Sequence, residues 1–134
     1  MSEENVELVR RIYSDGLFDR DPDLIVYEFA TPDIEYINPP EAVEPGIRRG
    51  RAQVAQALRN SSEMFDWRRH EVHELFDCED AVVAAVSFCA RIRGSGAELI
   101  QGEAHTWTFR DGRIVRFEWG RDLRAALEAA RLGE

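Results

Sequence analysis

The stretch HTWTFRDGRIVRFEW, residues 105–119, decides the fold, because it contains two strand patterns around a turn. Two turns are compatible with this stretch. A two-residue turn at Asp111 and Gly112 would pair Phe109 with Ile114 and leave both faces of the hairpin mixed in polarity. The alternative is a longer loop with a different register. The register matters because it decides which side chains point toward the interior.

A three-residue loop over residues 110–112 separates the side chains more cleanly. With Gly112 in a left-handed bulge position, Phe109 pairs with Arg113, Trp107 with Val115 and His105 with Phe117. A slip of one residue would turn one strand's side chains to the other face, so the cleaner separation favours this loop. We therefore expect one face of the hairpin to collect His105, Trp107, Phe109, Val115, Phe117 and Trp119.

The composition predicts one soluble domain without a polyanionic partner. A chain of 134 residues is the size of a single domain, which we place at residues 1–134. With 26 acidic and 17 basic residues, the net charge of −9 argues against nucleic-acid binding. The start MSEENVELV lacks a signal-peptide pattern, and no apolar run reaches the roughly 18 residues that span a membrane. We expect a cytoplasmic protein with no membrane partner.

Helical patterns dominate the first half of the chain. Apolar residues at helical spacing predict a helix from Ser2 to about Gly16. Asp21 followed by Pro22 is a cap and a first-turn proline, so a short second helix is expected before residues 31–33 stop it. After it, the sequence predicts a strand over residues 34–38 that ends at Pro39-Pro40, a loop over residues 40–50, and a third helix after Gly50.

The second half has the period of strands. Four strand patterns separated by the turn signals DCED, GSG and RDG predict an antiparallel meander over residues 69–76, 81–93, 97–109 and 113–119. Asp122 then caps a short C-terminal helix with an apolar stripe. Because the helices come first and the strands last, we expect an α+β fold with a curved sheet that wraps the helices.

In order and spacing, these segments resemble the nuclear-transport-factor-2-like superfamily, in particular its SnoaL-like and ketosteroid isomerase-like branch. The resemblance implies a cystatin-like cone, in which three N-terminal helices pack on a strongly curved, mainly antiparallel sheet with a short C-terminal helix. It also implies an internal ligand pocket and a homodimer. The segments that carry it are EENVELVRRIY, FDRDPDLI, IEYINPP, GRAQV, RGSGAELIQGEAHTWTFRDGRIVRFEW and DLRAALEAARL.

Three positions of the isomerase site can be carried over by this resemblance. The pocket tyrosine of the first helix falls on Tyr13, which agrees. The catalytic aspartate falls on Asn38, whose amide is not a base. The second aspartate, which donates a proton toward a developing oxyanion, falls on His105. The resemblance therefore implies a pocket at these residues without the isomerases' own base.

A second branch, the limonene-type epoxide hydrolases, has a Tyr-x-Asn pair on the first strand that helps to hold a water molecule. Tyr36 and Asn38 match this pair, and residues two apart on a strand reach the same side. The Asp-Arg-Asp set of that branch falls on Val86, Phe88 and Trp119. The similarity thus covers the residues that hold the water molecule and not the charged residues that carry out the reaction.

Alternation along the strand places Glu103 on the same face as His105, so a carboxylate and an imidazole can share the interior. We predict His105 as a base, Glu103 as the residue that orients it, and Tyr13 or Asn38 as donors to a developing oxyanion. Arg121 is expected to reach the mouth of the same pocket. The alternative is that His105 is a packed and satisfied side chain.

Two classes of function stay open at this point. One is an enzyme, such as an isomerase, cyclase or hydrolase, that acts on a small, largely apolar molecule. The other is a non-catalytic ligand-binding or dimerisation domain. In both, the pocket residues are Tyr36, Glu103, Trp107, Phe117, Trp119 and Arg121.

No cofactor and no metal site are predicted. His70 and His73 are three residues apart on a strand, so they point to opposite faces. Cys78 and Cys89 lack a second pair that would complete a ligand set, and we expect buried or half-buried thiols.

Overall fold

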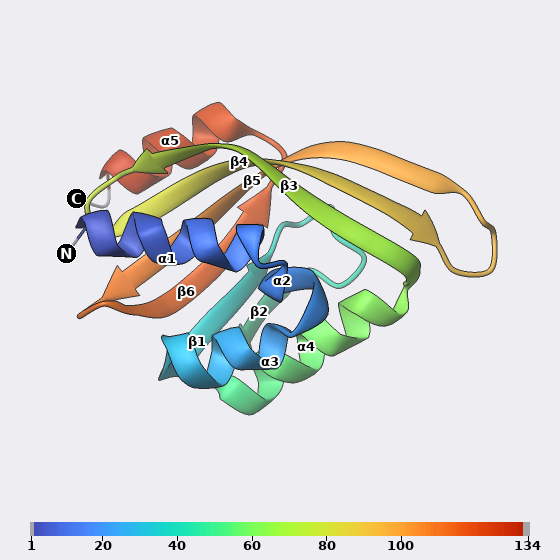
Figure 1. The fold of residues 1–134 in the computed structure, drawn as a ribbon, viewed down its shortest axis with the longest axis horizontal. Helices are drawn as coiled ribbons and strands as arrows, with labels where there is room; N and C mark the ends of the chain where they lie inside the picture. Colours follow the sequence, from blue (N-terminus) through green and yellow to red (C-terminus); the bar gives the residue numbers. More distant parts are fainter. Residues whose placement is uncertain (1, 133–134) are drawn as a thin grey trace.

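A computed structural model describes residues 2–132, and in this part of the chain six strands form one mixed sheet in the order β2-β1-β6-β5-β4-β3 (Figure 1). The helical elements are α1 (Ser2–Ser14), α2 (Leu17–Arg20), α3 (Pro22–Leu24), the π-helical turn η1 (Ile25–Phe29), α4 (Arg51–Glu63) and α5 (Leu123–Leu132). The strands are β1 (Ala30–Asn38), β2 (Gly46–Arg49), β3 (Phe65–Asp77), β4 (Ala81–Ile92), β5 (Glu98–Arg110) and β6 (Arg113–Gly120).

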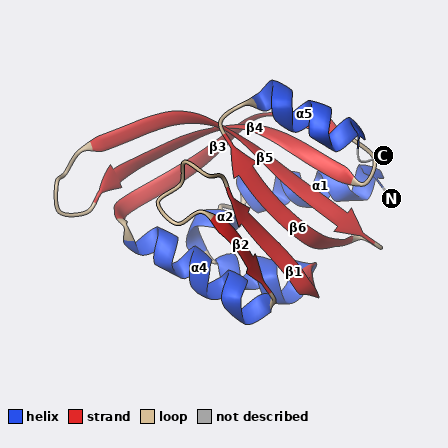
Figure 2. Cartoon of the chain, turned by 180° about the vertical axis from the view of Figure 1, so that it is seen from behind, coloured by secondary structure: helices blue, strands red, loops and turns tan. Residues whose placement is uncertain are grey.

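The meander from β3 to β6 is antiparallel throughout, as the sequence predicts. β1 lies beside β6 and runs parallel to it, and β2 pairs with β1 in the antiparallel sense. The α+β class is therefore confirmed, with one parallel pair that makes the sheet mixed. Figures 1 and 2 show the ends of β4 and β5 near residues 93–97 extending beyond the helices as an arm.

The turn between β5 and β6 corrects the register predicted from the sequence. Arg110 pairs with Arg113, so the turn is the two-residue one, and Asp111 and Gly112 have φ of 53° and 79°. Positive φ at both central residues is the requirement of a type I′ hairpin turn. The predicted three-residue loop is wrong.

A β-bulge explains why most side chains of the hairpin still lie on the face that the sequence predicted. The register shifts after Phe109 pairs with Ile114, which leaves Val115 as the extra residue of β6. Beyond it, Trp107 lies opposite Phe117. Ile114 is fully buried and Val115 is not, so the inward position predicted for Val115 belongs to Ile114.

The first helix forms as predicted, whereas the region of the predicted second helix is divided: α2 lies before Asp21, and the short α3 continues into the π-helical turn η1. Asp21 caps α3, accepting a hydrogen bond from the backbone N–H of Leu24 at 3.4 Å, and Pro22 occupies the first turn. Residues 31–33 do not stop a helix, because they already belong to β1. Pro32 is tolerated there, since the pairing of β1 with β6 is interrupted between Ala30 and Glu35.

The segment predicted as a loop over residues 40–50 contains the short strand β2, which forms the edge of the sheet beside β1. Its sequence, Gly-Ile-Arg-Arg, is short and charged, as is typical of an edge strand. The third predicted helix follows as α4, with Val54 and Leu58 buried.

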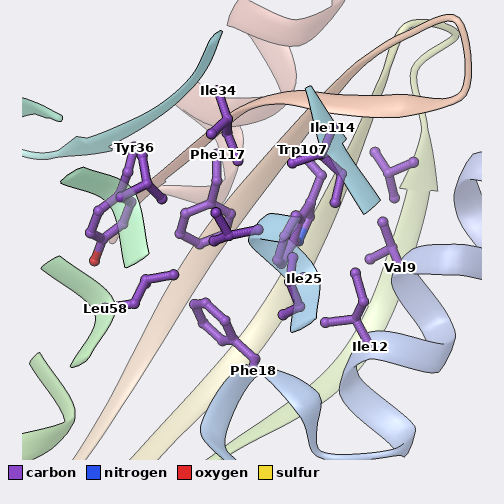
Figure 3. Packing of buried hydrophobic residues seen from close by; sticks show 14 of the residues in the cluster. Val9, Ile12, Phe18, Ile25, Ile34, Tyr36, Leu58, Trp107, Ile114 and Phe117 are labelled. Atoms are coloured by element: carbon purple, nitrogen blue, oxygen red, sulfur yellow. The ribbon is translucent and has the colours of Figure 1, made fainter. Parts of the chain in front are cut away.

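The two faces of the sheet are covered by different helices. Alternate residues of β4 enter different clusters: Val82 and Ala84 pack with α1, whereas Ala81 and Val83 pack with α5. Figure 2 shows α5 on the face opposite to α1. The larger cluster, which contains Trp107, Ile114 and the α1 residue Ile12, is seen in Figure 3.

The capped C-terminal helix is present as predicted. The side chain of Asp122 accepts a hydrogen bond from the backbone N–H of Ala125 at 3.1 Å. The predicted apolar stripe packs on the small cluster around Cys78, which is buried, whereas Cys89 is half-buried. Over residues 2–132, no helix has both the length and the apolar character required to cross a membrane.

Candidate functional site

A cavity of about 770 Å³ is bordered by β3 to β6, by α4 and by the loop between β1 and β2. Much of its wall is apolar, with Leu58 of α4, Phe88 of β4 and Phe117 of β6 among the lining residues. Figure 3 shows Phe18, Leu58, Tyr36 and Phe117 pointing toward one another from four different elements. The cavity therefore suits a small molecule with a largely apolar body.

Three polar side chains of the cavity wall lie close together in its buried part. One ring nitrogen each of His70 and His105 and one carboxylate oxygen of Glu103 all lie within 4.8 Å of one another. We call these three residues the polar cluster. Glu103 and His105 come from β5, as predicted from alternation, and His70 comes from β3.

His105 is held through both ring nitrogens. Nδ1 lies 2.5 Å from the hydroxyl of Tyr13, and Nε2 lies 2.8 Å from Oε1 of Glu103. A carboxylate only accepts, so the proton of the ring is on Nε2, and Nδ1 accepts the hydrogen bond that Tyr13 donates. The ring is 1% exposed, and burial lowers the pKa of His105 below 6.5, which favours this neutral form.

Tyr13 and Trp107 lie behind His105. The indole Nε1–H of Trp107 donates to the hydroxyl of Tyr13 at 3.0 Å, so this hydroxyl accepts one hydrogen bond and donates another. Burial raises the pKa of Tyr13 well above 10, and the phenol stays protonated. Neither residue is part of the cavity wall. The structure thus places the predicted ligand contact Trp107 in the core, where its 1% exposure leaves no surface for a ligand.

Glu103 is an ionised carboxylate in a buried place. Burial by itself would raise its pKa, but the hydrogen bond from His105 and the one from Gln101 outweigh burial, and the pKa of Glu103 is lowered. Gln101 donates to Oε2 at 2.7 Å, while Oε1 receives the His105 bond. Both carboxylate oxygens are therefore fixed in position.

His70 is the member of the cluster that the sequence did not predict. Its Nδ1 lies 2.6 Å from Oδ1 of Asp19, and its backbone N–H donates to Oδ2 of the same carboxylate at 2.9 Å. Burial opposes ionisation of Asp19, but the contacts with His70 and with Arg68 prevail and lower the pKa of Asp19. The Nε2 atom of His70 lies 3.9 Å from Oε1 of Glu103, beyond hydrogen-bond reach.

Arg68 completes the charged groups around the cavity. Its Nε lies 3.2 Å from Oδ1 of Asp19, and one terminal nitrogen donates to the carbonyl of Phe18 at 3.1 Å. Its side chain is 7% exposed and forms part of the cavity wall. A buried cation is therefore available beside the polar cluster.

The polar cluster contains side chains of the kinds that bind divalent metal ions. Two imidazoles and one carboxylate are a common set for divalent metals, and Asp19 and Gln101 would be suitable outer partners for His70 and Glu103. His105 does not fit, because its Nε2 carries the proton that Glu103 accepts. A shift of that proton to Nδ1 would leave the hydroxyl proton of Tyr13 without its acceptor. The hydrogen-bond pattern therefore favours proton chemistry over metal binding, and the absence of a metal stays a prediction.

The predicted residues of the first strand lie at another part of the wall. Oδ1 of Asn38 accepts from Nε1–H of Trp119 at 2.6 Å, and its amide donates to the carbonyl of Glu44 at 2.7 Å. Asn38 therefore holds the loop between β1 and β2 against β6. Tyr36 and Arg121 also line the cavity, and burial raises the pKa of Tyr36 to about 12.

The structure brings most predicted site residues to one cavity. Glu103, His105, Tyr36, Asn38, Phe117, Trp119 and Arg121 line it, and Tyr13 and Trp107 support it from behind. The sequence did not indicate Asp19, Arg68 or His70. The one usable signal was the spacing of Arg68 and His70, which are two residues apart on a strand and so share a face.

Comparisons with known proteins agree with this architecture. The protein with 21% identity from Jannaschia sp. CCS1, a candidate SnoaL-like polyketide cyclase, has a TM-score of 0.79 over 96% of this chain and 92% of that chain. TerC, crystallised with polyporic acid, is 25% identical, with a TM-score of 0.74 over 95% of this chain and 98% of that chain. A protein with a ketosteroid isomerase-like fold from Catenulispora acidiphila, in complex with trimethylamine, is 15% identical, with a TM-score of 0.74 and 92% of each chain covered.

No curated protein matches the sequence. The family model described as a SnoaL-like domain matches residues 9–117, which is most of the chain. This match agrees with the resemblance found in the sequence and with the similarity to the solved structures. The chain therefore belongs to the SnoaL-like domain family.

Proposed function

We propose that this protein is an enzyme that carries out acid–base chemistry on a small, largely apolar molecule, as an isomerase, cyclase or hydrolase. The observation that carries the proposal is the polar cluster itself. An ionised carboxylate and two imidazoles lie together in the wall of a cavity that is otherwise rich in apolar side chains. Carboxylate and imidazole side chains that lie together in one cavity are typical of a site of proton transfer.

The walls support the choice of ligand. Phe88 and Phe117 present flat apolar surfaces to the cavity, and Tyr36 adds a hydroxyl that stays protonated because its pKa is about 12. Such walls favour a molecule with a ring system and at least one oxygen. TerC, which is 25% identical to this chain, was crystallised with polyporic acid, and this compound is a natural first probe.

The second candidate is a non-catalytic ligand-binding domain, and one observation favours it. Both nitrogens of His105 already have partners, as in a packed and satisfied side chain. In that reading the polar cluster would define the shape and polarity of the pocket without moving a proton.

The test has two stages. Thermal-shift measurements with polyporic acid, hydrophobic ketones, epoxides and polyketide-like aromatics identify compounds that raise the melting temperature. Each such compound is then incubated with the protein and followed by NMR for isomerisation, cyclisation, hydrolysis or hydrogen exchange. Turnover by the wild type supports the enzyme, and binding without any change in the compound supports the second candidate. A melting temperature unchanged by every compound would count against both.

A homodimer and a cytoplasmic location remain predictions from the sequence and the resemblance. Light scattering of the purified protein tests the first. A mass of one chain at micromolar concentration would contradict it.

A further inference from the structure

We propose that His70, oriented by Asp19, is the residue that takes and returns the proton in this cavity, and that His105 positions the carboxylate of Glu103. This inference rests on the proposed enzymatic function and deepens it. It assigns the role of base to His70, a position that the resemblance to the isomerases did not indicate. It also makes His105, which the sequence indicated as a base, a positioning residue instead.

The carboxylate of Asp19 fixes the orientation of His70. One carboxylate, that of Asp19, contacts the ring nitrogen Nδ1 at 2.6 Å and the backbone N–H of the same residue at 2.9 Å. Because a carboxylate accepts, Nδ1 carries the ring proton, and Nε2 is left with a free lone pair. His70 lines the cavity, and a free lone pair there is what a general base requires.

Aromatic neighbours hold the ring of His70 in place. The imidazole of His70 stacks on Phe88 with ring centres 4.6 Å apart and planes at 28°, and Phe18 lies 4.8 Å away on a tilted plane. Two aromatic rings and one carboxylate therefore define the direction of Nε2. A base fixed in this way loses little conformational freedom when a substrate is bound.

His105, whose ring centre lies 5.3 Å from that of His70, is bonded differently. His105 donates from Nε2 to Glu103 and accepts at Nδ1 from Tyr13, so neither nitrogen is available to a substrate. Among the described residues, by contrast, no hydrogen bond reaches Nε2 of His70. Of the two histidines in the cluster, His70 is thus the one with an unoccupied nitrogen.

Glu103 has a defined part in this arrangement. Its Oε1, held by His105, lies 3.9 Å from Nε2 of His70. A proton accepted at Nε2 creates an imidazolium, and the carboxylates of Asp19 and Glu103 then lie on its two sides. The charged and titratable groups that face His70 are Asp19, Arg68, Glu103 and His105.

The geometry points to an enolisable carbonyl compound as the substrate class. Nε2 of His70 removes a proton from the carbon next to the carbonyl, and the electron pair of that C–H bond forms a C=C bond. The carbonyl π pair moves to the oxygen as an enolate, which Arg68 and the hydroxyl of Tyr36 can stabilise from the cavity wall. The imidazolium returns the proton to another atom of the same molecule. No oxidant, reductant or second reactant is required.

A first experiment observes the tautomers directly. The chain has three histidines, so imidazole ¹⁵N NMR signals are assigned by the single substitutions His70→Gln, His73→Gln and His105→Gln. At a pH where the rings are neutral, we expect His70 to carry its proton on Nδ1 and His105 to carry it on Nε2. A His70 ring protonated on Nε2 would overturn the inference, because its lone pair would then face Asp19.

A second experiment measures the proton transfer. Hydrogen–deuterium exchange at the carbon next to the carbonyl of α-tetralone is followed by NMR in D₂O, together with the other ketones that raise the melting temperature. We expect His70→Gln to slow exchange by about 10²–10⁴-fold, the usual contribution of a general base. His73→Gln is the matched control, because His73 is exposed, hydrogen-bonded to Ser87 and outside the cavity wall, and its exchange rate should equal that of the wild type.

Asp19 is a positioning residue, and its variant needs a readout beyond the rate. Asp19→Asn keeps the shape of the side chain but removes the negative charge that favours a protonated His70. The acidic limb of the pH–rate profile should therefore move to lower pH, and Asp23→Asn on the surface should leave the profile unchanged. An Asp19→Asn profile identical to that of the wild type would overturn the role of Asp19.

The outcomes separate the two proposals. Exchange at the wild-type rate in folded His70→Gln protein overturns the assignment of His70 and leaves the enzymatic function standing. Wild-type protein that binds the ketones and exchanges none of them overturns the enzymatic function, and the assignment of the base with it.

Discussion

The hydroxyl of Tyr13 should stabilise the folded protein far more than a typical surface hydroxyl, and Tyr13→Phe measures this. The substitution removes one oxygen and leaves the Nε1–H of Trp107 and the Nδ1 of His105 without their partner. Both side chains are 1% exposed, so water has little access to either group. A buried polar group without a partner costs about 1–3 kcal/mol, so the free energy of unfolding should fall by at least about 2 kcal/mol.

Urea unfolding followed by tryptophan fluorescence measures this change, and a melting curve gives a second value. At this chain length, 1 kcal/mol corresponds to roughly 3–5 °C, so a melting temperature lower by at least about 6 °C is expected. Tyr27→Phe is the matched control, because Tyr27 is 48% exposed. It should stay within about 0.5 kcal/mol of the wild type, as surface substitutions usually do.

The result that would refute this reasoning is a Tyr13→Phe protein as stable as Tyr27→Phe. It would mean that the hydroxyl does not join His105 to Trp107 in solution. His105 would then have a free nitrogen, and the argument that it only positions Glu103 would lose its basis.

Three further predictions concern pH, the loop and the hairpin. Because burial lowers the pKa of His105 below 6.5, the unfolded chain binds a proton that the folded protein excludes, so stability should decrease as the pH falls below 6.5. His105→Gln should remove this part of the decrease in urea titrations on either side of that pH, whereas His73→Gln should keep it. Asn38→Ala should speed amide hydrogen exchange in the loop between β1 and β2, since this side chain donates to a carbonyl of that loop. Gly112→Ala should destabilise the protein by about 1–2 kcal/mol, because φ at this position is 79°, and Gly102→Ala, at ordinary φ, should cost less.

Each of these has a contradicting outcome. Equal pH dependence in both histidine variants would show that His105 is not buried as a neutral ring. Unchanged loop exchange in Asn38→Ala would assign the loop's order to other contacts, such as those of Arg48 with the carbonyls of residues 44 and 45. A neutral Gly112→Ala would contradict the two-residue turn.

The sequence predicted the fold well because its local signals are strong and agree with one another. Asp21 with Pro22, and Asp122 before an apolar stripe, mark helix starts that the structure confirms. The separate strand patterns from residue 69 onward gave the antiparallel meander. The loop predicted over residues 110–112 was wrong, because a bulge at Val115 of β6 produces the same segregation of side chains as a longer loop. Alternation alone does not distinguish the two.

The candidate site was predicted only where its members share a strand. Glu103 and His105 are two residues apart on β5, and alternation is enough to place them together. Asp19 and His70 are 51 positions apart, and their contact depends on how α2 packs against β3. No local pattern predicts that packing, so the base that we propose was invisible to spacing arguments.

The most direct measurement of the central claim is a crystal structure of the protein with the tightest-binding ketone of the screen. The account predicts that the ketone occupies the cavity with its carbonyl toward Arg68 or Tyr36 and with the adjacent carbon in contact with Nε2 of His70. Both nitrogens of His105 should keep their bonds to Tyr13 and Glu103. A ketone whose carbonyl group points to solvent, or a cavity filled by side chains with the ketone bound elsewhere, would contradict the account.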